Sequence, residues 1–107
     1  MNKWIGMGRL TGDPELTYTK GSNPVAVANY TLAVDRRTSS DGSRQTDFIP
    51  CTAYGKIAEF AEKYLHKGNK IAVVGRIRID SWDGDDGRKK YKTSVTVDEH
   101  YFCEKTQ

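Results

Sequence analysis

Two sets of side chains in this sequence have the types and spacing needed to contact flat rings and anions. Phe48 and Tyr54 are an even number of residues apart, so in an extended strand both side chains leave on the same face. Arg76 and Arg78 alternate in the same way farther along the chain. Aromatic rings stack on other flat rings, and guanidinium groups bind phosphate. Rings on a strand more often belong to a core, so the neighbouring strands have to distinguish a binding surface from packing.

Residues 45–57 pass from a predicted strand into the one predicted helix. The strand alternates between two faces: Phe48, Thr52 and Tyr54 on the first, and Ile49, Cys51 and Ala53 on the second. We expect the second face to be buried and the first to carry the rings. The helix is predicted over residues 56–67, because its apolar side chains recur at helical spacing and a glycine follows.

The other predicted elements are strands. They cover residues 4–10, 25–35, 70–80 and 91–97, with a short terminal strand at 101–103. Gly6 and Gly8 predict close approach of another group to the first strand. On the strand at 70–80, Ile77 and Ile79 are predicted on the apolar face and the arginines on the other. We assign Trp4 to packing or to a subunit interface.

The order of these elements predicts a fold. Five main strands with a single helix between the third and fourth are typical of an all-β, five-stranded oligonucleotide/oligosaccharide-binding (OB) barrel. An SH3-like barrel or an open sandwich could use the same strands, but neither explains an amphipathic helix at this position. Residues 1–107 are predicted to form a single domain.

Composition narrows the function classes. The net charge of +3 favours an anionic partner without identifying it. Cys51 and Cys103 lie in strand-like runs without zinc-site spacing, which predicts reduced thiols. There is no signal-peptide pattern and no apolar run long enough for a membrane span, so we expect a cytoplasmic, nucleoid-associated protein without membrane contact.

Motifs for catalysis are missing from the sequence. His66 and His100 have no Cys, Ser or carboxylate at a recognisable spacing, and we expect structural or surface roles for both. Gly55-Lys56 lacks the rest of a phosphate loop, and the acidic run at 83–86 lacks the spacing of a calcium loop. We therefore expect no enzyme activity, no catalytic residue, no cofactor and no metal.

A binding surface for single-stranded nucleic acid is the stronger prediction, because such a surface needs rings for stacking and cations along the backbone path. Two further rings, Trp82 and Tyr91, flank the second long loop. Basic side chains lie beside the rings on the fourth strand and on both long loops: Arg36, Arg37, Arg44, Arg76, Arg78, Arg88, Lys89, Lys90 and Lys92.

The chain also resembles a known family, the bacterial single-stranded DNA-binding proteins. The resemblance covers nearly all of residues 2–103, and several motifs occur in the family's order: Asn2-Lys3, Gly8-Arg9-Leu10, Asp13-Pro14-Glu15, Val27-Ala28-Asn29-Tyr30-Thr31-Leu32-Ala33, Gln45-Thr46-Asp47-Phe48, Tyr54-Gly55-Lys56-Ile57-Ala58-Glu59, Tyr64-Leu65-His66-Lys67-Gly68 and Val74-Gly75-Arg76-Ile77.

The resemblance implies an OB barrel assembled as a homotetramer, around which single-stranded DNA wraps without sequence reading during replication, recombination and repair. It places the family's stacking rings on Phe48, Tyr54 and Trp82. Within the matching motifs, we also assign phosphate contacts to Lys3, Arg9 and Lys56.

Two features depart from the family pattern. Thr38 stands where the family has a further stacking ring, so we expect that loop to bind by charge. The sequence ends at residues 104–107 without the family's acidic tail, which predicts a tail-less or truncated form without tail-mediated partners. An alternative hypothesis is a dimeric primosomal accessory protein of the same fold, which docks replication partners.

Overall fold

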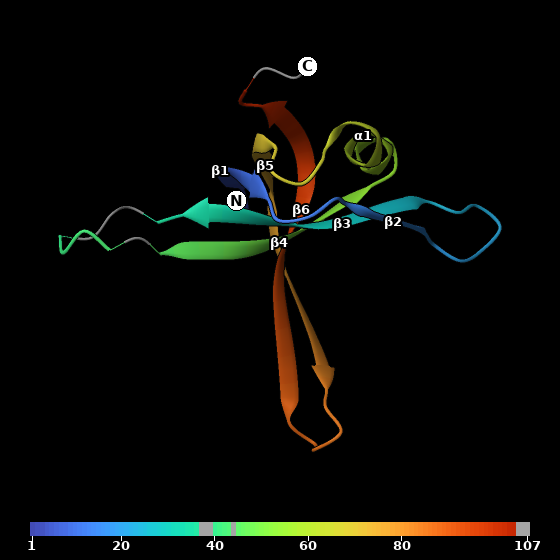
Figure 1. Cartoon of the computed structure of the whole chain (residues 1–107). Helices are drawn as coiled ribbons and strands as arrows, with labels where there is room; N and C mark the ends of the chain where they lie inside the picture. Colours follow the sequence, from blue (N-terminus) through green and yellow to red (C-terminus); the bar gives the residue numbers. More distant parts are fainter. Residues whose placement is uncertain (37–39, 44, 105–107) are drawn as a thin grey trace.

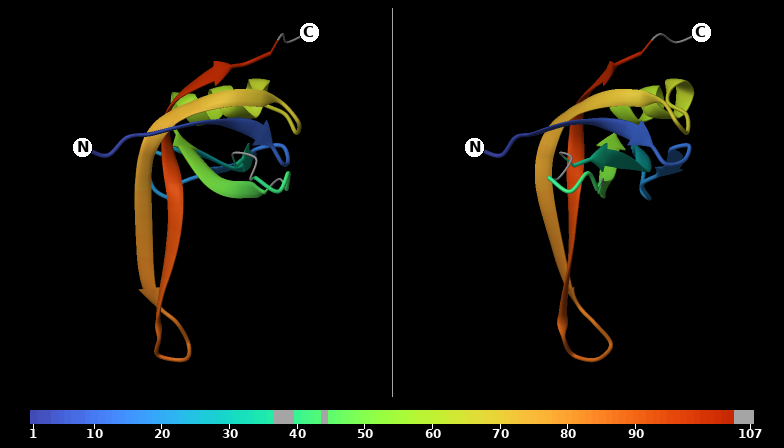
Figure 2. Two further views of the ribbon diagram at one scale, coloured as in Figure 1. Left: turned by 90° about the vertical axis from the view of Figure 1, so that its left-hand side faces the viewer. Right: turned by 60° about the vertical axis from the view of Figure 1, so that its left-hand side comes forward.

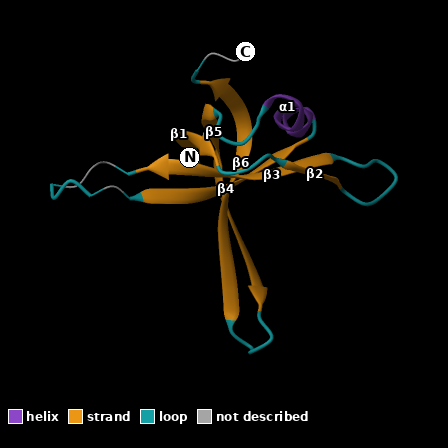
Figure 3. Cartoon of the chain, in the orientation of Figure 1, coloured by secondary structure: helices purple, strands orange, loops and turns teal. Residues whose placement is uncertain are grey.

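The computed structural model describes residues 1–36, 40–43 and 45–104. Its elements in chain order are β1 (Trp4–Leu10), β2 (Glu15–Tyr18), β3 (Ala26–Asp35), β4 (Thr46–Tyr54), α1 (Lys56–Tyr64), β5 (Lys70–Asp83) and β6 (Lys89–Phe102). Strands dominate the described residues, with α1 beside them (Figure 3). The predicted class, all-β with one helix, is confirmed.

The strands form a closed ring. Their order in the sheet is β1-β5-β6-β4-β3-β2, and β1 also pairs with β3, which closes the sheet on itself. The OB-barrel prediction is therefore confirmed, with one correction to the element order. The helix follows β4 rather than the third strand, because Glu15–Tyr18 forms a separate strand paired with β3.

Three predicted boundaries were wrong. The strand predicted over residues 70–80 continues to Asp83 as β5. The helix ends at Tyr64 instead of residue 67, because Leu65 already has extended backbone angles, although its side chain is buried. The two predicted C-terminal strands are one continuous strand, β6. Val74 pairs with Glu99 and Gly75 with Val97, so Asp98 is the extra residue of a β-bulge.

The core lies inside the ring and under the helix. Alternate residues of β3 point inward, and Ala58 and Ala61 bring α1 onto the sheet. Trp4 packs at the edge of this core, with its ring over Gly6. A Cβ on Gly8 would stand 2.2 Å from the carbonyl oxygen of Ala33, so only glycine lets β1 pass this close to β3. Both glycines thus serve close approach, as predicted.

The β5–β6 hairpin extends well beyond the barrel (Figures 1 and 2). The radius of gyration is 15.5 Å, larger than the roughly 13 Å expected for a compact domain of this length. The β5–β6 hairpin accounts for one error of prediction. Ile79 was expected on a buried face, but it is exposed because this part of β5 has left the barrel.

The remaining composition-based expectations concern thiols and membrane spans. Cys51 and Cys103 are both free thiols, the first buried and the second half-buried. No helix in the described part of the chain has the length and apolar character needed to cross a bilayer.

Candidate nucleic-acid interface

The outer face of β4 carries two aromatic rings, those of Phe48 and Tyr54. Phe48 is 64% exposed and Tyr54 is 39% exposed, whereas Cys51 and Ala53 are fully enclosed in the core. The alternation of a strand produces this division, because successive side chains point to opposite faces. Both rings are therefore available to an external ligand.

The β5–β6 hairpin continues this face away from the barrel. Arg76, Arg78 and Trp82 are separated by even intervals on β5, so they share one face of the hairpin. Trp82, which is 48% exposed, lies directly opposite Lys90 on β6. A ring and a cation therefore lie side by side on the projecting arm.

Tyr91 is not on the same face as Trp82. It lies opposite Ser81, one position out of phase, and its neighbours on that face include the exposed Ile79. Trp82 and Tyr91 flank one loop in the sequence, which predicted a shared surface. The register of the hairpin instead places their side chains on opposite faces.

Tyr54 and Arg78 link β4 to β5. Nη1 of Arg78 donates to the hydroxyl oxygen of Tyr54 over 3.4 Å, across the strand β6 that separates their own strands. This contact places a guanidinium group beside the ring of Tyr54. The side chains predicted to stack bases and those predicted to bind phosphate therefore meet on one surface.

Several of the predicted cations already have carboxylate partners. Arg76 pairs with Asp98 at 2.9 Å and Arg78 with Asp80 at 3.1 Å. All four side chains are about half exposed, and exposed ion pairs of this kind contribute little to stability. The guanidinium groups therefore remain accessible to a competing anion.

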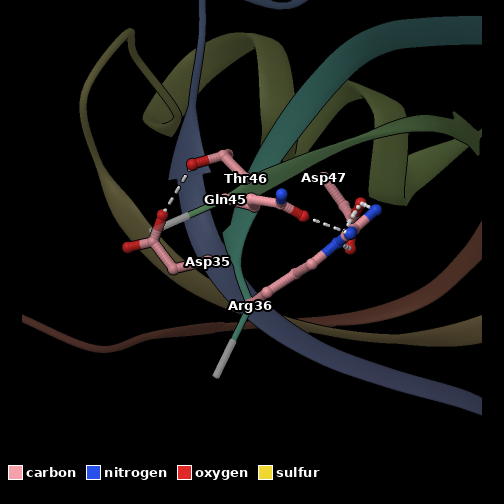
Figure 4. A network of polar contacts seen from close by, with 5 residues as sticks. All are labelled: Asp35, Arg36, Gln45, Thr46 and Asp47. Carbon is pink, nitrogen blue, oxygen red and sulfur yellow. Dashed lines mark hydrogen bonds and ion pairs between the residues drawn. The ribbon is translucent and has the colours of Figure 1, made fainter. Parts of the chain in front are cut away.

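Arg36 has the most extensive pairing. Its guanidinium donates to both carboxylate oxygens of Asp47 and to the side-chain oxygen of Gln45 (Figure 4). This hydrogen bonding holds the pKa of Asp47 below its usual value. Arg36 thus links the end of β3 to the start of β4 through its contacts with Asp47 and Gln45. Arg37, Thr38 and Arg44, on the same loop, lie outside the described residues.

Arg9 lies on β1, beside the first residue of β5 and therefore at the end of β5 that is away from the hairpin. It is opposite Lys70 in the β1–β5 ladder, donates to the carbonyl oxygen of Gly68 and pairs with Glu104 at 3.4 Å. The structure therefore does not bring it together with the rings of β4 and the hairpin.

Other predicted cations are unpaired. Among the described residues, no ion-pair partner within 4.0 Å is found for Lys3, Lys56, Arg88, Lys90 and Lys92. Lys3 is held near the middle of β5 by its neighbour Asn2. The Asn2 amide donates to the carbonyl of Ile77 at 2.8 Å and accepts from its N–H at 2.9 Å. Sequence reasoning noted Asn2 only as part of a motif.

The two histidines lie apart and in different surroundings. Nε2 of His100 lies 2.7 Å from the hydroxyl of Tyr30, and burial lowers its pKa from 6.5 to about 4. His66 is exposed, with Nδ1 3.9 Å from a carboxylate oxygen of Asp13. In the described ranges, no group of three or more His, Cys, Asp or Glu side chains gathers as metal ligands would.

Comparison with known proteins gives a consistent result. The model of the single-strand binding protein family matches residues 1–103. Single-stranded DNA-binding protein 3 of Clostridium acetobutylicum is 46% identical over 104 residues, which are 97% of this chain and 72% of that protein. The single-stranded DNA-binding protein of Clostridium tetani is also 46% identical, over 97% of this chain and 71% of its own length. For that of Halalkalibacterium halodurans the values are 46%, 97% and 61%.

Proposed function

Because this chain belongs to the single-strand binding protein family, we propose that it binds single-stranded DNA with little dependence on sequence. Its role would be to hold and protect exposed strands during replication, recombination and repair. Binding of this kind needs no catalysis. Bases stack on aromatic side chains, and cations follow the phosphate backbone.

The observation that carries the proposal is the common outer face of β4 and the β5–β6 hairpin. Phe48 and Tyr54 offer rings on the barrel, and Trp82 offers a third on the arm. A single strand lying along this face would stack bases on these rings. We define this surface, made of Phe48, Tyr54, Arg76, Arg78, Trp82, Lys90 and Lys92, as the ring track.

Two kinds of basic side chain would contact phosphate: those without a carboxylate partner and the arginines that pair with one. Lys90 and Lys92 are unpaired and lie on the ring-track face of the hairpin, opposite Trp82 and Asp80. Lys3, Lys56 and Arg88 add unpaired charge on neighbouring segments. The paired guanidiniums would exchange an exposed carboxylate for a phosphate, which also accepts bidentate hydrogen bonds.

Tyr91 and Lys89 occupy the other face of the hairpin. They would contact DNA only where the DNA passes around to this second face of the β5–β6 hairpin. We therefore assign Tyr91 a secondary part in stacking, and Trp82 the principal one on this hairpin.

Assembly as a homotetramer is the second part of the proposal. Ile5 and Met7 project from the outer face of β1, and Tyr101 from β6, all more than half exposed. In the ladders, Met7 lies opposite Ala72 and Ala72 opposite Tyr101, so apolar side chains form a row across three strands. Contiguous exposed apolar surface of this kind marks an interaction site. Sedimentation velocity should give a tetramer, and a Met7→Glu variant should give smaller species.

Titration with labelled oligonucleotides tests the main proposal. Oligo-dT and a duplex of the same length are each titrated with the protein, and anisotropy is recorded at low and moderate salt. We expect tight, salt-sensitive binding of the single strand and much weaker binding of the duplex. Equal affinity for the two forms would overturn the proposal.

A further inference from the structure

A row of polar side chains crosses the outer face of the barrel, transverse to the strands. Glu15 on β2 lies opposite Asn29 on β3, and Asn29 lies opposite Thr52 on β4. Thr52 lies opposite Thr96 on β6, which in turn is opposite Arg76 on β5. Directly opposed residues of neighbouring strands share a face, so these side chains follow one line, in which Thr96 is buried and the other four are at least partly exposed.

This line runs between two rings of the ring track. Thr52 lies on β4 between Phe48 and Tyr54 and faces the same side as both. Tyr54 is only two residues from Thr52, so a base that stacks on Tyr54 would bring its own edge or that of its neighbour close to the polar row.

The structure has a groove at the β2 end of the row. Its volume is about 310 Å³, and it opens between the loop after β1, the strands β3 and β4, and Lys92 of β6. This is near the lower limit for pockets that hold small organic ligands. The polar side chains that line it include Asp13, Glu15, Asn29, Thr52 and Lys92.

Hydrogen bonds within the groove fix which groups are left for a ligand. Thr52 Oγ1 donates to Asn29 Oδ1 at 2.9 Å, so the Asn29 amide nitrogen is left to donate outward. Asp13 Oδ1 accepts from the N–H of Lys67 at 2.7 Å, which leaves its second oxygen as an acceptor. The carboxylate of Glu15 has no hydrogen-bond partner among the described residues. The groove thus offers carboxylate acceptors next to the amide donor of Asn29.

Such a pairing of acceptor and donor matches one class of base edge. Cytosine presents an exocyclic amino group beside a ring-nitrogen acceptor, and adenine does the same. Carboxylates accept from the amino group of cytosine, and Asn amides pair with adenine. Thymine presents a carbonyl oxygen where these bases carry the amino group, and that oxygen would face Glu15. A phosphate would meet the same carboxylates and be repelled.

We propose that this groove is a base-edge subsite that favours cytosine and adenine over thymine. The inference rests on the proposed function, because it concerns a base delivered by a strand on the ring track. It adds a local base preference to a surface whose stacking contacts are indifferent to sequence. Glu15 supplies the acceptor and Asn29 the donor.

The test compares oligo-dC with oligo-dT on the full chain. Dissociation constants are measured for the wild type, for Glu15→Ala and for Glu62→Ala, which removes the same charge from the exposed side of α1. Loss of a carboxylate near DNA raises affinity for both oligonucleotides, so the ratio of the two constants is the readout. We expect Glu15→Ala to shift this ratio towards oligo-dT by about threefold to tenfold, and Glu62→Ala to leave it unchanged.

The outcomes separate the two levels of the proposal. A wild type that binds neither oligonucleotide contradicts the proposed function. Binding of both, with the same ratio in wild type and Glu15→Ala, overturns the base-edge subsite and leaves the proposed function standing. A ratio that moves equally in both variants also overturns it, because the effect is then one of charge alone.

Discussion

Nη1 of Arg78 lies 3.4 Å from the hydroxyl oxygen of Tyr54, which joins a cation on β5 to a ring on β4 across the strand β6 between them. The contact matters because single-stranded DNA presents bases and phosphates in alternation along one backbone. A surface that binds it needs flat and cationic side chains within a nucleotide's reach of each other. The sheet meets this requirement because β6 pairs with β5 on one side and with β4 on the other.

Trp82→Ala should weaken binding of oligo-dT by about 1–3 kcal/mol, the usual contribution of one stacked base. Because Trp82 is half exposed on the projecting arm, the melting temperature should change little. Tyr91→Ala is the matched control on the other face of the same hairpin and should have the smaller effect on affinity. Equal losses in the two variants would show that the hairpin register does not determine which ring stacks.

The dependence of affinity on salt should report the unpaired cations. About five phosphate contacts give a slope of about −3.5 in a plot of log K against log salt, or roughly a hundredfold loss between 50 and 200 mM. The double variant Lys90→Ala/Lys92→Ala should reduce the magnitude of this slope by about 1.4. Lys63→Ala/Lys67→Ala removes the same charge around the end of the helix. A slope that changes equally in both double variants argues against phosphate contacts on the hairpin.

Stability should fall on acidification because of His100. Its pKa is about 4 in the folded protein, below the ordinary 6.5, so the unfolded chain binds a proton here more readily. The free energy of unfolding should therefore decrease as pH drops from about 6.5 to about 4, while this group adds no pH dependence above that range. Melting temperatures of the wild type and His100→Phe across this range measure the effect. Parallel curves for the two proteins would refute it.

Gly8→Ala should destabilise the barrel by about 1–3 kcal/mol, as overpacking does. The added Cβ would meet the carbonyl oxygen of Ala33 at 2.2 Å and push β1 away from β3, which closes the ring. Gly12→Ala is the control, because a Cβ there meets no atom within 4 Å. Urea unfolding compares the two variants. Equal midpoints would mean that the closure of β1 on β3 is not sterically demanding.

Local periodicity was enough to predict which face of β4 is buried. Alternation depends only on neighbouring residues, so the inward positions of Cys51 and Ala53 follow from the sequence itself. The same rule failed at Ile79. Burial there depends on how far the barrel extends along β5, which is a property of the closed sheet and not of the strand.

Long-range pairing explains the other differences. Residues 15–18 make a short strand only because β3 lies beside them, and a segment of four residues carries too little periodicity to be recognised. The ion pair of Arg76 with Asp98 joins residues far apart in sequence, across a bulge that the pattern does not reveal. The relative phase of Trp82 and Tyr91 depends on the turn between β5 and β6, which spacing within either strand does not determine.

The central claim is that Phe48 and Tyr54 form the part of the ring track that lies on the barrel. Its most direct test is the affinity of Phe48→Ala/Tyr54→Ala for oligo-dT, with Tyr64→Ala/Phe102→Ala as a control that removes exposed rings from the helix side. Circular dichroism and melting temperature check that both variants fold. The account predicts a loss of about thirtyfold or more for the first variant and little change for the control. A folded Phe48→Ala/Tyr54→Ala protein that binds oligo-dT as tightly as the wild type would contradict it.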